Sequence, residues 1–236
     1  MPVWMLLLAA GTLRAGVVID QIGTLASYNL QASTLPMPSQ IDADFPSYSC
    51  VVIDDFAVIS SELRITGVSA LFQADAGFSG FSGVSGYAVN FYSSPAHAAA
   101  NLTGDIGSVV VSSGVATLTQ TTRAGSSLGY GLVSLPVDLQ LPAAGTYWIG
   151  VSPVAASSLN GVFRMMDSGA TGPSPGGSNG KFANPGEGYG VGSLMSTDVN
   201  YAYSVIAVPE PGLISLCFFG SAVLLAGRRR SSHQKS

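Results

Sequence analysis

Charge and reactive side chains are scarce in this sequence. Charged residues make up 9% of its 236 positions, and it holds two histidines and two cysteines. His97 and Cys50 each stand alone, without an H-E-x-x-H or C-x-x-C motif, which argues against a zinc enzyme. Cys217 lies in an uncharged run near the C-terminus and is out of reach of Cys50, so no disulfide framework is expected. We expect Cys50 to be a small buried hydrophobe.

Basic residues are rare in the body of the chain. Four of them lie between residues 16 and 207: Arg64, Arg123, Arg164 and Lys181. Acidic residues outnumber them, so the body would repel phosphate backbones, and we expect no nucleic-acid partner. Lys181 follows a glycine, but Phe182 stands where a phosphate-binding loop needs Ser or Thr.

The arrangements typical of hydrolases are also missing. A G-x-S-x-G match at 125–129 lies in a Gly-rich stretch without the flanking strand and helix, and the later histidine is His233 in the C-terminal tail. Asp54 and Asp55 are adjacent on a predicted strand and would point to opposite faces, so they are poor partners for acid/base catalysis. We expect one of them to be buried and hydrogen-bonded, and we do not expect an enzyme.

Short apolar runs with a period of two, separated by Gly, Pro, Ser and Asn, fill the body. They predict strands at 17–22, 50–59, 63–73, 87–92, 109–112, 115–120, 131–141, 147–154, 161–165 and 201–208. Only Pro95–Leu102 favours a helix. The pattern predicts one all-β domain over residues 16–207, an antiparallel two-sheet sandwich that is jelly-roll-like.

Two details of pairing are also predicted. Ser113-Gly114 between the fifth and sixth runs is typical of a hairpin turn. Pro136 lacks a backbone N–H, so we expect the strand that contains it to lie at a sheet edge.

Two segments are Gly-rich: 76–86 is either a loop or a Gly-rich strand edge, and 167–192 predicts a long loop of the kind that carries ligand sites at the ends of the sheets. They carry four aromatic residues: Phe78, Phe81, Phe182 and Tyr189. Aromatic faces can stack on sugar rings, and Phe182 and Tyr189 are the candidate glycan contacts. Trp148 lies within a predicted strand, and we expect it in the core.

Asp42 and Asp44 are candidate Ca²⁺ ligands, because Asp-x-Asp puts two carboxylates on one side of an extended chain and oxygen-rich loops bind this ion. The spacing of an EF-hand is absent. The alternative is that both are solvated carboxylates in a turn. No other cofactor is expected.

The N-terminus has the pattern of a signal peptide over residues 1–15. An apolar run from Val3 to Gly11 precedes an expected cleavage site after Ala15. Two features depart from the usual pattern, since no base precedes the run and Leu13 occupies a position where a small residue is common. The alternatives are a first buried strand or an uncleaved anchor.

The C-terminus combines three elements. Pro209-Glu210-Pro211 precedes an uncharged run, 212–227, and Arg228-Arg229-Arg230 follows it. As a helix this run would rise about 24 Å, slightly less than a bilayer core of about 30 Å, and Arg228 can reach the headgroups by snorkelling. By the positive-inside rule the tail 231–236 faces the cytoplasm and the body lies on the other side. The alternatives are a plain anchor helix or a buried helix.

This combination resembles the PEP-CTERM sorting signal of Gram-negative bacteria, over residues 208–230. The resemblance implies recognition by exosortase at Pro209, Glu210 and Pro211, and a topological stop at Arg228, Arg229 and Arg230. It also implies cleavage near the motif and delivery to the cell surface or extracellular matrix, alongside exopolysaccharide. Stretches of the body such as 53–56 and 145–151 are similar to other PEP-CTERM ectodomains, but no activity follows from them.

We therefore expect an exported protein with a structural or interaction role, held transiently in the inner membrane and then placed at the cell surface or outside the cell. The alternative function is a carbohydrate-binding module, assisted by calcium. A hydrolase is the third hypothesis.

Overall fold

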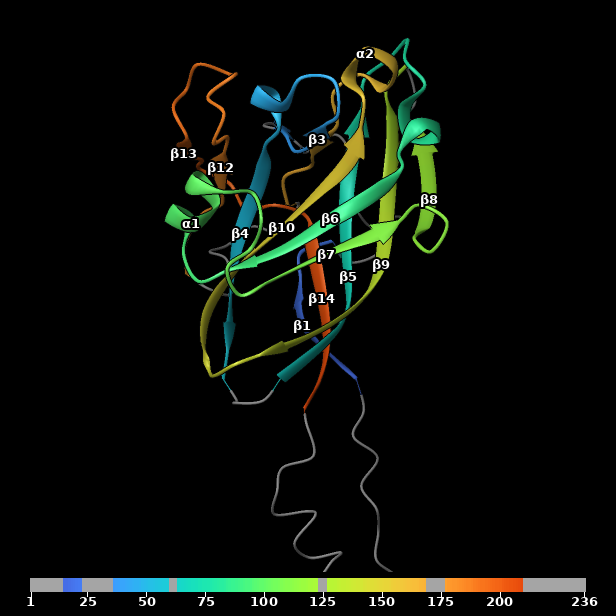
Figure 1. Ribbon diagram of the computed structural model, residues 1–236. Helices are drawn as coiled ribbons and strands as arrows, with labels where there is room; N and C mark the ends of the chain where they lie inside the picture. The colour runs from blue at the N-terminus through green and yellow to red at the C-terminus, as the bar shows by residue number, and fades with distance from the viewer. Residues whose placement is uncertain (1–14, 23–35, 60–62, 123–126, 169–176, 210–236) are drawn as a thin grey trace, which may run out of the picture.

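The computed structural model describes residues 15–22, 36–59, 63–122, 127–168 and 177–209. Over these residues the chain forms two mainly antiparallel sheets with few short helices, which confirms the predicted two-sheet sandwich (Figure 1). In the described part, no helix is both long enough and apolar enough to cross a bilayer. Most of the predicted signal peptide and all of residues 210–236, with the predicted membrane helix, lie outside the described residues.

The first sheet has seven strands. They are β1 (Gly16–Asp20), β2 (Met37–Pro38), β5 (Leu63–Ala74), β8 (Thr117–Thr122), β9 (Gly129–Leu141), β11 (Arg164–Met165) and β14 (Tyr203–Pro209). β5 is central: β9 and then β8 lie on one side of it, while β14 and β11 follow one another along its other side. β1 pairs with β14 and β2 pairs with β11.

The second sheet also has seven strands. They are β3 (Ile41–Asp42), β4 (Val51–Val58), β6 (Gly86–Tyr92), β7 (Gly107–Ser112), β10 (Gly145–Ala155), β12 (Lys181–Ala183) and β13 (Leu194–Ser196). Their order is β13-β12-β4-β10-β6-β7, and β3 pairs with the end of β10 in parallel. The helices are short: η1 (Pro46–Tyr48), η2 (Gly80–Gly83), α1 (Pro95–Ala100) and α2 (Ser157–Asn160).

β5 keeps apolar residues on its core-facing side along its whole length, although their spacing changes partway along the strand. Leu63 and Ile65 face the core at odd positions, whereas Val68 and Phe72 face it at even positions. The pairing with β14 shifts here, because the adjacent residues Ile206 and Ala207 pair with Gly67 and Ile65, so Thr66 is an extra residue in β5, a β-bulge. The bulge therefore changes the phase of the pattern without turning either apolar run toward solvent.

The outer face of the second sheet is partly covered by α1. Trp148 and Tyr92 form a small cluster there with Ala98 of the helix. Trp148 is 8% exposed, which confirms that it is a core residue. The helix begins at Pro95, whose fixed φ and missing N–H suit the first helical position.

The predicted hairpin at Ser113-Gly114 is wrong. β7 pairs with β6 in the second sheet, whereas β8 pairs with β9 in the first. Each of the two strands is the outermost of its sheet, so the turn crosses between the sheets and closes one side of the sandwich. Both kinds of connection need the same compact turn, which is why the local sequence did not separate them.

The prediction that Pro136 lies in an edge strand is correct for the part of β9 that contains it but not for the whole strand. β9 has neighbours on both sides up to Ser134, where its pairing with β8 ends. Pro136 itself pairs only with Gly67 of β5. Pro136 thus lies in the part of β9 that has a described ladder on one side only, beside the register shift with β5, where a missing N–H is tolerated.

Tyr203 of the first sheet completes hydrogen bonds in the second. The pairing of β4 with β10 stops at Ile53. Beyond it, the Tyr203 hydroxyl donates to the Val52 carbonyl at 2.6 Å and accepts from the Val151 N–H at 3.2 Å. The Ser39 hydroxyl accepts from the Val52 N–H at 3.2 Å and donates to the Val151 carbonyl at 2.7 Å. Side chains therefore satisfy the buried backbone groups that the ladder leaves.

The last strand reaches the first residue of the proposed sorting motif. β14 runs to Pro209, which pairs with Leu63 of β5. The folded domain thus extends two residues past the boundary expected at 207. At the other end, β1 begins at Gly16, the residue that would follow cleavage after Ala15.

Candidate functional site

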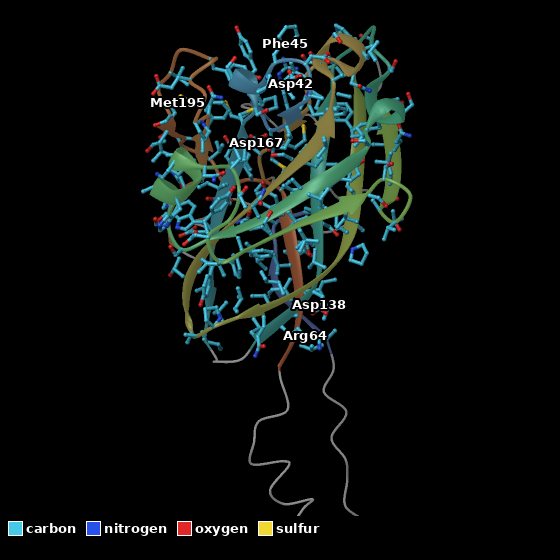
Figure 2. The ribbon with its side chains drawn as sticks, in the orientation of Figure 1. Asp42, Phe45, Arg64, Asp138, Asp167 and Met195 are labelled. Atoms are coloured by element: carbon cyan, nitrogen blue, oxygen red, sulfur yellow. The ribbon has the colours of Figure 1, made fainter. Side chains whose placement is uncertain are left out.

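A cleft of about 410 Å³ opens at one end of the sandwich. Its lining residues, which define the aromatic cleft, are Asp42, Phe45, Tyr48, Ser157, Val162 and Tyr189. In Figure 2, Asp42 and Phe45 lie at the end of the molecule opposite to Arg64 and Asp138. Arg64 pairs with Val208 near the end of β14, so the aromatic cleft is far from the point where the chain leaves the last strand.

Four aromatic rings form a continuous series from solvent to core. Phe45 packs edge-on against Tyr48 with ring centroids 6.4 Å apart, and Tyr48 packs edge-on against Tyr189 at 5.3 Å. Tyr189 in turn contacts Phe182 at 5.5 Å. Phe45 is 52% exposed and Tyr48 44% exposed, whereas Phe182 is 1% exposed. The buried end of the series fixes the orientation of the exposed rings, because edge-to-face contacts are directional.

Asn184 ties the two segments that carry these rings. Its side-chain NH₂ donates to the Ser47 carbonyl at 2.9 Å and to the Ser49 carbonyl at 2.8 Å. Its side-chain oxygen accepts from the Tyr189 N–H at 3.2 Å. A Cβ at Gly186 would lie 2.6 Å from the Ser47 backbone, so the close approach of η1 to the β12–β13 loop requires glycine.

The carboxylates of Asp42 and Asp44 stabilise the wall of the aromatic cleft that lies across from Tyr189. Asp42 is 6% exposed, and its Oδ1 accepts from the N–H groups of Asp44 at 3.0 Å and of Phe45 and Ser157 at 3.3 Å each. Asp44 Oδ2 accepts from the Ser158 N–H at 3.3 Å. Both carboxylates thus fasten the loop before η1 to the start of α2. Among the described residues, no group of three or more His, Cys, Asp or Glu side chains converges on one point. Calcium at Asp42 and Asp44 stays a prediction.

Cys50 lies beneath the aromatic cleft as an inert thiol. It is 0% exposed, which confirms the expected small buried hydrophobe. Burial raises the pKa of its thiol to about 12, although the Tyr189 hydroxyl donates a hydrogen bond to the sulfur. Burial also raises the pKa of Tyr189 above its ordinary value. Neither group supplies a nucleophile at neutral pH.

The structure separates the predicted glycan contacts. Phe182 lies in β12 and is buried, so the expectation that its ring offers a face to a sugar is wrong. The error came from assigning 167–192 to a loop, whereas Lys181–Ala183 pairs with both β4 and β13. Tyr189 does line the aromatic cleft.

Phe45 and Tyr48 were missed in the sequence. They flank Pro46 in the turn that follows Asp42 and Asp44, and two aromatic residues around a proline in a polar turn could have drawn attention to them. Phe78 is 51% exposed but does not line the aromatic cleft, and Phe81 is buried against Phe163.

A Ser-His-Asp cluster lies away from the aromatic cleft. The Ser93 hydroxyl is 2.9 Å from His97 Nδ1 and donates to Asp105 at 2.6 Å, and the same His97 nitrogen is 3.2 Å from Asp105. A catalytic triad needs serine and aspartate on different ring nitrogens. Although burial acts to raise it, hydrogen bonds from Ser93 hold the pKa of Asp105 below its ordinary value. The cluster fastens the start of α1 and does not match a hydrolase.

The fold and the aromatic cleft define a β-sandwich with a small-molecule-sized opening at one end, since ligand sites commonly measure about 300–1,000 Å³. No protein-family model matches the sequence, and no curated protein matches it. The function must therefore be inferred from the chemistry of the chain itself.

Proposed function

We propose that this protein is exported and sorted to the cell surface or extracellular matrix, where the sandwich has a structural or interaction role among exopolysaccharides. Residues 209–211 would be recognised by exosortase, 212–227 would hold the chain in the inner membrane before processing, and 228–230 would fix its orientation. The proposal includes no nucleic-acid partner, no catalytic role and no obligatory cofactor.

The observation that carries the proposal is the position of the last strand. β14 extends to Pro209, the last residue that the structure describes and the first residue of the motif. β1 and β14 both reach the same end of the sandwich, while the helices η1 and α2 lie at the other (Figure 1). Processing near residues 209–211 would leave every strand of the sandwich in place, and this arrangement suits a signal that is removed after export.

We also propose the finer fold assignment of a jelly roll. The order β1-β14-β5-β9 in one sheet and β4-β10-β6-β7 in the other supports it. Successive strands mostly alternate between the two sheets, as two interleaved Greek keys require. β8, β2, β11, β3, β12 and β13 would then be additions at the margins.

The second candidate function is a carbohydrate-binding module. It is favoured by the exposed rings of the aromatic cleft, and calcium at Asp42 and Asp44 would be its auxiliary ion. The site itself is argued in the next subsection.

Intact mass measurement of the protein recovered from its native cells tests the sorting proposal. We expect a mature form that begins near Gly16 and ends near residues 209–211. Replacing Glu210 and Pro211 with alanine should leave the C-terminus unprocessed, whereas alanine at Ser232 and Gln234, in the predicted tail, should not change processing. A native protein intact to Ser236 in the membrane fraction would overturn the proposal.

A further inference from the structure

Two large aromatic side chains, Phe45 and Tyr48, stand side by side and partly exposed at the rim of the aromatic cleft. Phe45 and Tyr48 are 52% and 44% exposed, although both belong to a segment with several hydrogen bonds to its surroundings. Single exposed apolar residues are ordinary, but neighbouring rings at the rim of a cleft mark a contact surface.

The rings are held in place before any ligand arrives. Tyr48 rests edge-on against Tyr189, and Asn184 links the η1 backbone to the backbone of Tyr189. On the other wall, Asp42 binds the N–H groups of Phe45 and Ser157. A preorganised surface loses little conformational entropy on binding, which favours recognition of a ligand.

The polar groups of the aromatic cleft select the class of ligand. Its lining includes the hydroxyl-bearing residues Tyr48 and Ser157 and one carboxylate, Asp42, and it includes no base, while the Tyr189 hydroxyl bonds to the buried Cys50. A negative charge without a compensating base disfavours phosphates and uronic acids. A pyranose ring offers an apolar C–H face for the aromatic rings and an edge of hydroxyls for the polar groups, so its chemistry matches both parts of the lining.

The location of the aromatic cleft suits a polymeric ligand. It lies at the opposite end of the sandwich from the end of β14 (Figures 1 and 2). In a chain attached at its C-terminus, this end would face away from the attachment. The opening would then be accessible to polysaccharide chains around the cell.

We propose that the aromatic cleft formed by Phe45, Tyr48 and Tyr189 is a binding site for neutral polysaccharide. Sugar rings stack on the exposed faces of Phe45 and Tyr48, and Asp42 and Ser157 are the hydrogen-bonding groups of the site. This inference rests on the proposed function in so far as that function brings the domain to exopolysaccharide.

Affinity electrophoresis of the full-length chain in mild detergent tests the site. The gels contain a neutral β-glucan, galactomannan, xylan or dextran, with alginate as the anionic comparison. We expect at least one neutral polymer to retard the wild-type protein. Tyr48→Ala and Phe45→Ala should each weaken that binding about tenfold, as for a central aromatic contact. Tyr48→Trp, which keeps an aromatic face, should retain it.

Phe78→Ala is the matched control. Phe78 is 51% exposed, close to the 52% of Phe45, but it does not line the aromatic cleft, so its replacement should leave retardation unchanged. Thermal unfolding of each variant confirms that it is folded. Retardation by alginate alone, by no neutral polymer, or equally in Tyr48→Ala and wild type would overturn the proposal.

The two proposals fail separately. Correct C-terminal processing without polysaccharide binding would overturn the site and leave the sorting proposal standing. If the protein binds neutral polysaccharide but stays unprocessed in its native cells, the sorting proposal is overturned and the binding site stands.

Discussion

The carboxylate of Asp54 accepts a hydrogen bond of 2.7 Å from the backbone N–H of Tyr201. Asp54 belongs to β4 of the second sheet, and Tyr201 leads into β14 of the first, so this bond links the two sheets through the interior. Asp54 is 0% exposed, and Asp55 beside it is 1% exposed. Burial raises the pKa of Asp54 to about 7, even though the N–H groups of Tyr201 and Asp55 act to lower it.

Stability should therefore fall as the pH rises through the range in which Asp54 loses its proton. Its ordinary pKa is 3.8 and its pKa in the folded protein is about 7, so the folded state binds a proton that the unfolded chain releases. The stabilising contribution is complete below the unfolded value and is lost by about pH 7. The unfolding free energy should fall by up to about 4 kcal/mol, because a shift of one unit in pKa corresponds to about 1.4 kcal/mol. Denaturant unfolding between pH 4 and pH 8 measures it.

Asp54→Asn isolates this effect, because asparagine does not titrate. The difference in unfolding free energy between wild type and variant should change with pH over this range, whatever the variant's absolute stability. Asp138→Asn is the control, since Asp138 is exposed and its hydrogen bonds with Arg64 lower its pKa. Its difference from wild type should be flat between pH 5 and pH 8. A flat difference for Asp54→Asn would show that the buried carboxyl is not protonated.

Tyr203→Phe should destabilise the sandwich by about 2 kcal/mol or more. The change removes only a hydroxyl, but it leaves the Val52 carbonyl and the Val151 N–H without their partner in the interior. Tyr147→Phe is the matched control, because the Tyr147 hydroxyl bonds to Ala143 in a partly buried turn that water can reach, and a loss of about 1 kcal/mol or less is expected. Equal losses in urea unfolding would contradict this role of Tyr203.

The long strands could be predicted from the sequence, and the connections between sheets could not. Much of β9 and parts of β5 alternate buried and more exposed residues, whereas β4 and β10 are buried on both faces over most of their length and show as apolar runs. β12 has three residues in a Gly- and Pro-rich setting, too few to show a period. Its pairing with β4 is decided by contacts distant in sequence.

The candidate site was predicted only in part for the same reason. Tyr189 was singled out because it is an aromatic residue in a Gly-rich segment. Its neighbour Tyr48 comes from a turn far away in the chain, and the two meet because Asn184 binds the Ser47 and Ser49 carbonyls. Local patterns carry no information about such a meeting.

Asn184→Ala should loosen the aromatic cleft. The change leaves the Ser49 carbonyl and the Tyr189 N–H without these hydrogen bonds, and we expect a loss of about 1–3 kcal/mol in unfolding free energy. Binding of neutral polysaccharide should weaken as well, because Tyr48 and Tyr189 are no longer fixed relative to each other. Asn101→Ala is the control: Asn101 is exposed and accepts one bond from Thr103, so a change within about 0.5 kcal/mol is expected. If Asn184→Ala were as stable as the wild type, the hydrogen bonds of Asn184 would not be what holds the two segments together.

The position of β14 determines where the chain can be cut without unfolding. β14 lies between β1 and β5, so its loss would remove the described partner of β1, leave one edge of β5 unpaired from Leu63 to Ala70, and remove Val205 from the core. A chain that ends at Pro209 should show a cooperative thermal transition, and a chain that ends at Ser204 should lose it. Circular dichroism of the two truncations compares them directly. Cooperative unfolding of both at the same midpoint would show that the strand is dispensable. If only the longer chain folds, the sandwich tolerates the loss of the residues after Pro209 but not a cut within β14, so the proposed processing would have to occur after that strand.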